Sequence, residues 1–176
     1  DILNKKDNQK ILDAGCGDGL FAEHISGRNY KVGVDFIPES ENTKKNFNKF
    51  YQYDLNKGFP RELERENGFD YILFMDILEH LQDYDNLLND SKNLLKKDGR
   101  IVISLPNFAN IYVRLNLLIG RLPLADKGIL DRTHLHLFTY RIIKNILRKH
   151  KLEIVEQRVT PIPVIEILPD ILKRKV

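Results

Sequence analysis

The sequence predicts an α/β domain in which helices cover both faces of a mostly parallel central sheet. Short apolar runs alternate with helical stretches along most of the 176 residues, which is the pattern of repeated βαβ units. One run, FDYILFM at residues 69–75, is almost continuously apolar, as expected of a central strand covered on both faces. A glycine-rich turn follows the first apolar run directly, and the chain length suits a single domain.

Strands are predicted where short apolar runs are bounded by turn residues. The expected strands are residues 10–13, 30–35, 50–53, 69–75, 100–105 and 152–159. Pro106 ends the fifth of them, because proline has no amide hydrogen to donate to a neighbouring strand.

Helices are predicted between the strands, at residues 20–26, 38–47, 83–97 and 140–149. Pro38 suits the first turn of the second helix, and Asp98-Gly99 provides a C-cap and a turn after the third. Residues 107–139 break the alternation. Within them, residues 111–124 are apolar with two arginines. We favour a lid helix or core packing for this stretch, while a dimer surface and a membrane-interface helix remain open. The proline-containing tail from Thr160 is expected to be irregular.

Composition narrows the class of protein. The chain has 28 basic and 25 acidic residues, a balance that argues against a nucleic-acid partner. Its single cysteine, Cys16, excludes an internal disulfide and fits a reducing, cytoplasmic environment. No apolar run reaches the roughly 18 residues of a transmembrane segment, and no secretory leader opens the chain. Because the first residue is Asp1, we expect a trimmed chain or part of a longer protein.

Three glycines, Gly15, Gly17 and Gly19, occupy alternate positions where the first strand meets the first helix. Glycine lets the backbone turn tightly and approach a ligand without a Cβ in the way. The following helix adds free N–H groups at its N-terminus. An ordinary strand-to-helix turn rarely needs three such glycines. The spacing is G-x-G-x-G, whereas the dinucleotide fingerprint is G-x-G-x-x-G.

Two aspartates follow the next two strands. Asp35 can accept hydrogen bonds from both hydroxyls of a ribose, and Asp54 can accept one from an adenine amino group. The carboxyl ends of parallel strands share one edge of the sheet, where open α/β sheets bind ligands. We therefore expect the glycine turn, Asp35 and Asp54 to lie side by side.

The segments ILDAGCGDG, VGVDF, YQYDL, FDYILFMDILEHL and LKKDGRIVISLPN resemble, in this order, the successive motifs of class I S-adenosyl-L-methionine (SAM)-dependent methyltransferases. The resemblance covers about residues 11–107. It implies a Rossmann-like class I fold, SAM as cofactor and S-adenosyl-L-homocysteine as product. Complete folds of this type have a seventh, antiparallel strand, to which no segment is assigned here.

The resemblance also implies roles for individual residues. The methionine moiety is held by Asp13 and by the turn comprising Gly15, Cys16, Gly17 and Gly19. Asp35 binds the ribose, Phe36 packs on the adenine, and Asp54 and Leu55 contact the adenine edge. Met75 and Asp76 line the methionine side near the sulfonium. A single domain then has a cofactor half at about residues 1–107, an acceptor side at 107–139 and a C-terminal helix, strand and tail at 140–176.

The second half is similar to narrower groups. Residues 104–108, 113–115 and 117–121 look like the MetW-like subgroup. LDRTHLHLFT at residues 130–139 looks like methyltransferase domains found beside glycosyltransferases in cell-surface polysaccharide loci. The favoured hypothesis is O-methylation of a sugar or other small hydroxylated acceptor, with a glycan acceptor and a fused or associated glycosyltransferase as partners. The alternative is a SAM-binding partner or regulatory protein without catalysis. A nicotinamide-dependent oxidoreductase is disfavoured by the glycine spacing and Asp54.

Three histidines are candidate general bases, because imidazole titrates near neutrality. They are His80, His134 and His136. His80 has the alternative of capping a helix or fixing the Glu79 loop. His134 and His136 alternate with leucines, which puts both on one face, either a pocket wall or an ordinary hydrogen-bonded surface. 

Two further residues of this segment are candidates for binding the substrate. Asp131 and Arg132 either contact the acceptor or form a structural ion pair. No metal is expected, because His134-x-His136 offers only two ligands and class I transfer does not require one.

Overall fold

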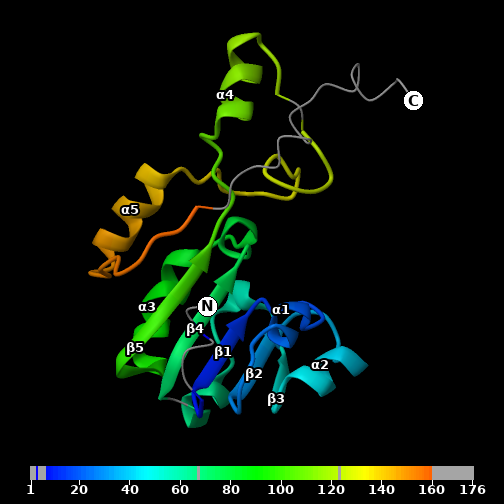
Figure 1. The fold of residues 1–176 in the computed structure, drawn as a ribbon, viewed down its shortest axis with the longest axis vertical. Helices are drawn as coiled ribbons and strands as arrows, with labels where there is room; N and C mark the ends of the chain where they lie inside the picture. Colours follow the sequence, from blue (N-terminus) through cyan, green and yellow to red (C-terminus); the bar gives the residue numbers. More distant parts are fainter. Residues whose placement is uncertain (1–2, 4–6, 67, 123, 160–176) are drawn as a thin grey trace.

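The computed structural model describes residue 3 and residues 7–66, 68–122 and 124–159. Five parallel strands form one sheet in the order β3-β2-β1-β4-β5 (Figure 1). The strands are β1 Lys10–Ala14, β2 Tyr30–Asp35, β3 Lys49–Gln52, β4 Phe69–Met75 and β5 Leu95–Ser104. β1 pairs with β2 on one side and with β4 on the other, so the glycine turn after β1 leaves the middle of the sheet.

Alternate residues of the central strands pack on opposite faces of the sheet, as a strand period of two requires. Leu12 and Ile72 belong to a buried cluster that includes Leu87 and Leu88 of α3 (Tyr84–Leu94). Ile11 and Leu73, the adjoining residues of the same strands, join a second cluster with Ile25 and Leu3. Both faces are therefore covered, as predicted. Each such side chain contributes about 1.5–3 kcal/mol through burial.

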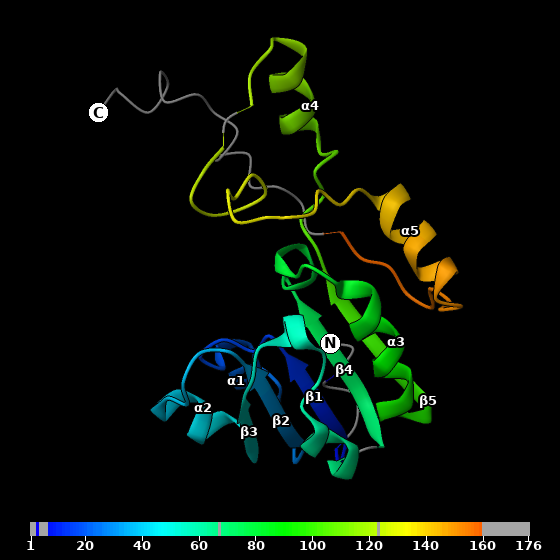
Figure 2. The same ribbon diagram turned by 180° about the vertical axis from the view of Figure 1, so that it is seen from behind.

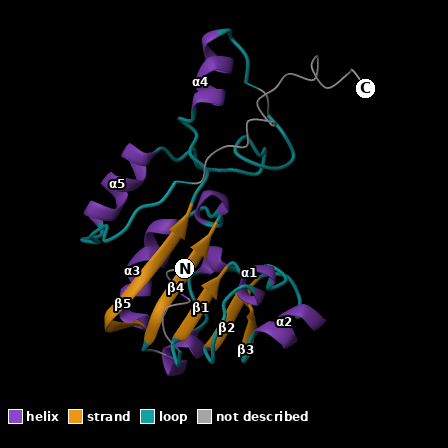
Figure 3. Cartoon of the chain, viewed as in Figure 1, coloured by secondary structure: helices purple, strands orange, loops and turns teal. Residues whose placement is uncertain are grey.

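The helices lie between and beyond the strands (Figure 3), and a side chain caps the N-terminus of each α-helix described except α1, which begins after Gly19. The remaining α-helices are α1 Leu20–Glu23, α2 Glu41–Asn46, α4 Ile111–Leu118 and α5 Tyr140–Lys149, and the 3-10 turns include η2 Leu55–Lys57, η3 Arg61–Glu66 and η4 Leu78–His80. Thr139 Oγ1 accepts a hydrogen bond from the Ile142 amide at 3.3 Å, and the predicted range of α5 is confirmed. α2 starts later than predicted, because Ser40 and Thr43 form a capping box ahead of it.

The predicted turn at Asp98-Gly99 is wrong. β5 begins at Leu95 and runs through both residues, with an irregular register between Phe69 and Tyr71 of β4. A Cβ on Gly99 would lie 2.8 Å from the carbonyl oxygen of Phe69, so the glycine serves close backbone approach between the strands.

The predicted strand at residues 152–159 is also wrong. These residues carry no regular secondary structure, and most of them are exposed. Lys151 reverses the chain with a φ of 57°, and Leu152 and Ile154 then line a shallow hollow together with Leu147 of α5. The segment packs along the helix instead of reaching a sheet edge. The expected irregular tail from Thr160 lies outside the described residues.

α4 stands clear of the sheet, beyond the carboxyl ends of the strands (Figures 1 and 2). Val113 is the buried residue of this helix, while Ile111, Leu115 and Leu118 are exposed. The core-packing interpretation of this stretch is therefore wrong, because Val113 is the only fully buried residue among the described residues of 111–124. Among the described residues, no helix combines the length and apolar character needed to cross a membrane.

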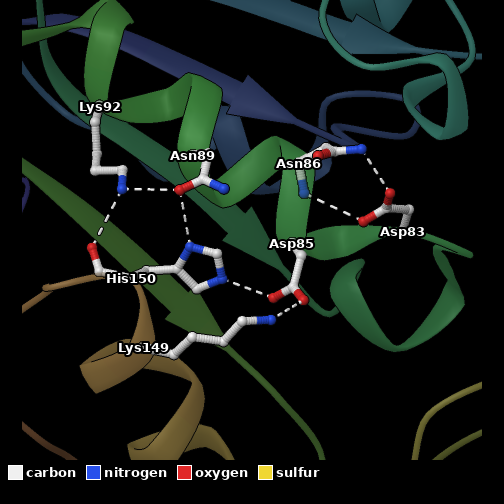
Figure 4. A network of polar contacts seen from close by, with 7 residues as sticks. All are labelled: Asp83, Asp85, Asn86, Asn89, Lys92, Lys149 and His150. Atoms are coloured by element: carbon white, nitrogen blue, oxygen red, sulfur yellow. Dashed lines mark hydrogen bonds and ion pairs between the residues drawn. The ribbon is translucent and has the colours of Figure 1, made fainter.

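A polar network fastens α5 to α3 (Figure 4). His150 follows the last residue of α5. Its Nε2 is hydrogen-bonded to Asp85 Oδ1 at 2.6 Å, and its Nδ1 is hydrogen-bonded to Asn89 Oδ1 at 3.0 Å. Lys149 Nζ donates to Asp85 Oδ2 at 2.5 Å, and Lys92 Nζ donates to the His150 carbonyl at 3.2 Å. Lys149 and His150 together hold the pKa of Asp85 below its usual range.

Candidate functional site

The glycine turn after β1 has the backbone that only glycine adopts freely. Gly15, Gly17 and Gly19 have φ values of 82°, 54° and 84°. A Cβ on Gly15 would lie 2.4 Å from the Ile77 side chain, so the turn packs directly against the segment that follows β4. A Cβ on Gly17 would meet nothing within 4 Å. Gly15 thus serves the fold, and Gly17 leaves open space beside the turn.

Asp35 organises this turn from the end of the neighbouring strand. Its Oδ2 accepts the Gly17 amide at 2.8 Å, and its Oδ1 accepts the Ile37 amide at 3.1 Å. Asp35 is only 6% exposed. From the sequence, Asp35 was expected to bind a ribose, and its hydrogen bond to the Gly17 amide was not predicted. The signal was available, because β1 and β2 are parallel neighbours whose ends share one edge.

Asp13 is a buried carboxyl without a partner. It is 2% exposed, and within the described residues neither oxygen has a hydrogen-bond partner. Burial, with a smaller contribution from Asp35, raises the pKa of Asp13 to about 7. An unpaired interior carboxylate costs folding free energy. Such a group is chemically suited to a cationic ligand that would pair with it.

The residues expected around the adenine follow β2 and β3, two neighbouring strands of the sheet. Phe36 is 72% exposed, so its ring is available to a ligand. Asp54 Oδ1 accepts the backbone amide of Asn56 at 3.0 Å and its side-chain amide at 3.1 Å. Leu55 packs in the core, which leaves its backbone for any contact with a ligand.

The side chain of Cys16 faces the interior of the domain. Its side chain packs with Ala22 and Phe47, and a Cβ on Gly33 would lie 2.9 Å from its sulfur. Burial raises the pKa of the thiol. The side chain of Cys16 therefore supports the turn by packing against Ala22 and Phe47 in the interior.

The end of β4 lies beside the glycine turn. Asp13 of β1 pairs with Leu73 of β4, so Met75 and Asp76 follow on the same edge. Asp76 has an unusual φ of 51°, and its Oδ1 accepts a hydrogen bond from Ser104 Oγ at 2.8 Å. These contacts turn the chain sharply from β4 toward η4.

Glu79, His80 and His134 form a cluster next to this turn. The Glu79 carbonyl accepts the amides of Leu135 at 2.8 Å and His136 at 3.2 Å, which brings the two segments together. His134 Nε2 lies 4.0 Å from Glu79 Oε1, and the rings of His80 and His134 meet edge to face at 4.8 Å. The potential ligand atoms of the three side chains lie within 4.8 Å of one another.

Burial shapes the titration of the cluster. Glu79 is fully buried, and within the described residues neither carboxylate oxygen has a hydrogen-bond partner. Burial, reinforced by Asp76, raises the pKa of Glu79 to about 7. Burial, and then the charge of His80, lowers the pKa of His134. Burial therefore disfavours the charged forms of both His134 and Glu79.

Thr133 links His80 to Asp131. Its hydroxyl donates to Asp131 Oδ1 at 2.7 Å and lies 3.2 Å from His80 Nδ1. Hydrogen bonds from Thr133 hold the pKa of Asp131 below its usual range. Arg132 lies 3.9 Å from Asp126, with both side chains exposed. Asp131 therefore supports His80, and the ion pair of Arg132 involves Asp126.

His136 has a different setting from the other two histidines. Its Nε2 lies 2.9 Å from the Leu81 carbonyl oxygen, and its ring packs against Tyr84 and Phe138. His134 and His136 do share one face of their segment, because Leu135 and Leu137 between them are exposed. His134 enters the cluster, while the ring of His136 braces the segment.

The sequence profile of a family described as a methyltransferase domain matches residues 2–157. This chain belongs to that family. A solved SAM-dependent methyltransferase from Archaeoglobus fulgidus has the same fold, with a TM-score of 0.56 at 23% identity, covering 85% of this chain and 63% of that one. The expected Rossmann-like fold is confirmed.

Two curated relatives are ubiquinone biosynthesis O-methyltransferases. The protein from Pelagibacter ubique is 36% identical over 109 residues, which is 57% of this chain and 43% of that protein. The one from Glaesserella parasuis is 31% identical over 118 residues, which is 60% of this chain and 50% of that protein. The chain therefore spans about half the length of these curated relatives.

Proposed function

We propose that this methyltransferase domain transfers the methyl group of SAM to a hydroxyl oxygen of a small acceptor. One observation carries the proposal. The unpaired carboxyl of Asp13 lies beneath a glycine turn, one strand away from the cluster of Glu79, His80 and His134. A site for a cationic donor and a polar acceptor site thus adjoin each other.

The donor half fits SAM residue by residue. Asp13 would pair with the ammonium group of the methionine moiety, and Gly17 offers an approach free of side-chain atoms. Asp35, already bonded to the turn, retains lone pairs for the ribose hydroxyls. Phe36 would stack on the adenine, and Asp54 and the Leu55 backbone would contact its edge. Met75 and Asp76 would lie beside the sulfonium.

The acceptor half would position a hydroxyl in line with the sulfonium methyl. In the displacement, the hydroxyl oxygen gains the methyl group, the sulfonium leaves as a neutral thioether and the hydroxyl proton goes to a base. Positioning supplies much of the acceleration in such a reaction. Among the three candidate histidines, His80 and His134 lie in the cluster with the carboxyl of Glu79, and Asp131 and Arg132 flank them.

For the acceptor, we propose a sugar hydroxyl on a glycan precursor of the cell surface. Support comes from the resemblance of residues 130–139 to polysaccharide-associated methyltransferase domains. The names of the curated relatives point instead to the ubiquinone pathway, so a phenolic hydroxyl is the competing acceptor. A glycosyltransferase partner would accompany the sugar acceptor and not the phenolic one.

The test is methyl transfer from isotopically labelled SAM to sugar nucleotides, lipid-linked glycans and catechols, read by mass spectrometry. We expect labelled O-methyl product from the sugar class. His134→Ala should lower turnover by about 10²-fold or more while leaving the dissociation constant of S-adenosyl-L-homocysteine unchanged. His24→Ala, on the exposed end of α1, is the matched control. Binding without transfer to any acceptor class would identify the SAM-binding partner instead.

A further inference from the structure

We propose that Glu79, His80 and His134 form a binding site for one divalent first-row transition-metal ion. The two histidines come from segments far apart in sequence, η4 and the stretch that precedes α5, yet their ligand atoms and that of Glu79 lie within 4.8 Å of one another. Sequence reasoning discounted a metal because it paired His134 with His136. The fold pairs His134 with Glu79 and His80 instead.

Glu79 supplies the strongest observation. Its side chain is inaccessible to solvent, and neither carboxylate oxygen has a hydrogen-bond partner among the described residues. A buried carboxyl is normally paired, hydrogen-bonded or bound to a metal. The partner nearest to hand is the imidazole of His134, and its 4.0 Å separation from Glu79 Oε1 is too long for a hydrogen bond. That spacing leaves room for an ion between them.

The hydrogen bonds of Thr133 prepare His80 as a ligand. The hydroxyl of Thr133 gives its only proton to Asp131 Oδ1, so it must accept the proton of His80 Nδ1. This fixes the tautomer in which Nε2 carries a free lone pair. Metal-bound histidines characteristically donate their other ring nitrogen to a carboxylate or another acceptor in this way.

His134 is held in place by the backbone on either side of it. The Leu135 and His136 amides both donate to the Glu79 carbonyl, and the His134 amide donates to the Asp131 carbonyl at 3.2 Å. Its side chain is 6% exposed.

Distances and donor types favour a transition metal. Ligand bonds of about 2.0–2.2 Å place two ligand atoms of one ion no more than about 4.4 Å apart. The cluster therefore needs to close by about half an ångström. Two imidazoles and one carboxylate suit Zn²⁺, Co²⁺, Mn²⁺ or Fe²⁺, whereas Mg²⁺ and Ca²⁺ prefer sets of oxygen ligands.

An ion held by three protein ligands keeps coordination positions open for water or a substrate oxygen. This consequence rests on the proposed function: an acceptor hydroxyl bound there would lose its proton more readily. The two imidazoles would then act as ligands, and the ion would stabilise the attacking oxygen.

The experiment is a titration of the EDTA-treated, dialysed chain with Co²⁺, followed by visible absorption and by competition with Zn²⁺. We expect about one ion per chain, with d–d bands typical of mixed nitrogen and oxygen ligands. His134→Gln and Glu79→Gln should each weaken binding at least tenfold. Thr133→Val, which removes the hydroxyl between His80 and Asp131, should weaken it about 10-fold. His24→Gln, an exposed histidine on α1, should bind as the wild type does.

Circular dichroism and binding of S-adenosyl-L-homocysteine establish that each variant is folded. The proposal is overturned if the folded wild type binds no Co²⁺, or if His134→Gln and Glu79→Gln bind it unchanged. It is also overturned if Mg²⁺ binds in a manner that depends on Glu79 but not on His134. The titration contains no methyl donor or acceptor, so failure of the transfer assay leaves its outcome intact.

Discussion

The carboxyl group of Asp13 is buried, and its burial lowers the free energy of unfolding when the group is ionised in the unfolded chain. Burial raises its pKa to about 7, against about 3.9 in an unfolded chain. Below the unfolded pKa the group is neutral in both states and costs little. As the pH rises from about 4 to 7, the unfolded chain releases the proton while the folded chain retains it, so stability falls. With a difference of about three units, the loss reaches up to about 4 kcal/mol.

Asp13→Asn should abolish that part of the pH dependence. The variant's free energy of unfolding, measured by urea denaturation without ligand, should fall less than that of the wild type between pH 4.5 and 8. Binding of S-adenosyl-L-homocysteine should weaken, because the amide cannot pair with an ammonium group. Asp98→Asn removes an exposed carboxylate and is the control. Parallel pH profiles for wild type and Asp13→Asn would contradict the buried-carboxylate account.

At the scale of single elements, the glycine turn must satisfy packing at Gly15 and leave open space for a ligand at Gly17, and mutations can separate the two requirements. Gly15→Ala should destabilise the fold by more than about 2 kcal/mol, because a clash with Ile77 adds to the cost of a positive φ. Gly17→Ala should cost only about 1–2 kcal/mol, since its Cβ meets nothing. Its effect should appear in binding, where S-adenosyl-L-homocysteine affinity falls about tenfold or more, roughly 1.4 kcal/mol.

Thermal melts and calorimetry on the two variants measure these effects. The expected pattern is a crossed one, with the larger stability loss at Gly15 and the affinity loss of a stable protein at Gly17. Equal stability losses at both positions would show that the open space beside Gly17 has been assigned wrongly.

α5 depends on the polar network with α3, so its docking should respond to the charge of Asp85. Asp85→Asn should lower the free energy of unfolding by about 1–3 kcal/mol, because His150 is buried and loses a charged partner. The depressed pKa of Asp85 means that its contribution is present above about pH 4 and lost as the pH falls below it. Urea denaturation at pH 7 and pH 3 tests both points. Asp90→Asn, an exposed position on the same helix, should change stability by less than 0.5 kcal/mol, roughly the effect of an ordinary surface substitution.

Periodicity predicted those elements whose ends carry their own signals. β2, β4 and α5 have the predicted bounds, because turn residues or a capping threonine fix where they begin. The prediction of a strand at residues 152–159 was wrong. An alternating pattern indicates which residues could share one face, but it does not indicate whether a neighbouring strand is available for pairing. β5 was predicted too short, since the approach of Gly99 to the Phe69 backbone depends on pairing across the sheet.

Over the whole molecule, the arrangement of the proposed donor side was more predictable than that of the proposed acceptor side. The residues expected around SAM follow successive parallel strands, so their adjacency is a consequence of sheet order. The proposed acceptor side depends on which of the three histidines lie beside Glu79. That choice is made by hydrogen bonds from Leu135 and His136 to the Glu79 backbone, which no local pattern encodes.

The strand order β3-β2-β1-β4-β5 also determines the order in which strands can pair while the chain is synthesised on the ribosome. β1 and β2 emerge early, yet β1 lacks its second neighbour until β4 has been synthesised. The packing of Gly15 against Ile77 can form only after residue 77 has been synthesised. A chain stalled before residue 75 would expose one edge of β1, which is prone to pair with other chains. A chain stalled between residues 107 and 134 would carry the proposed donor half while still lacking the imidazole of His134 beside Glu79 and His80.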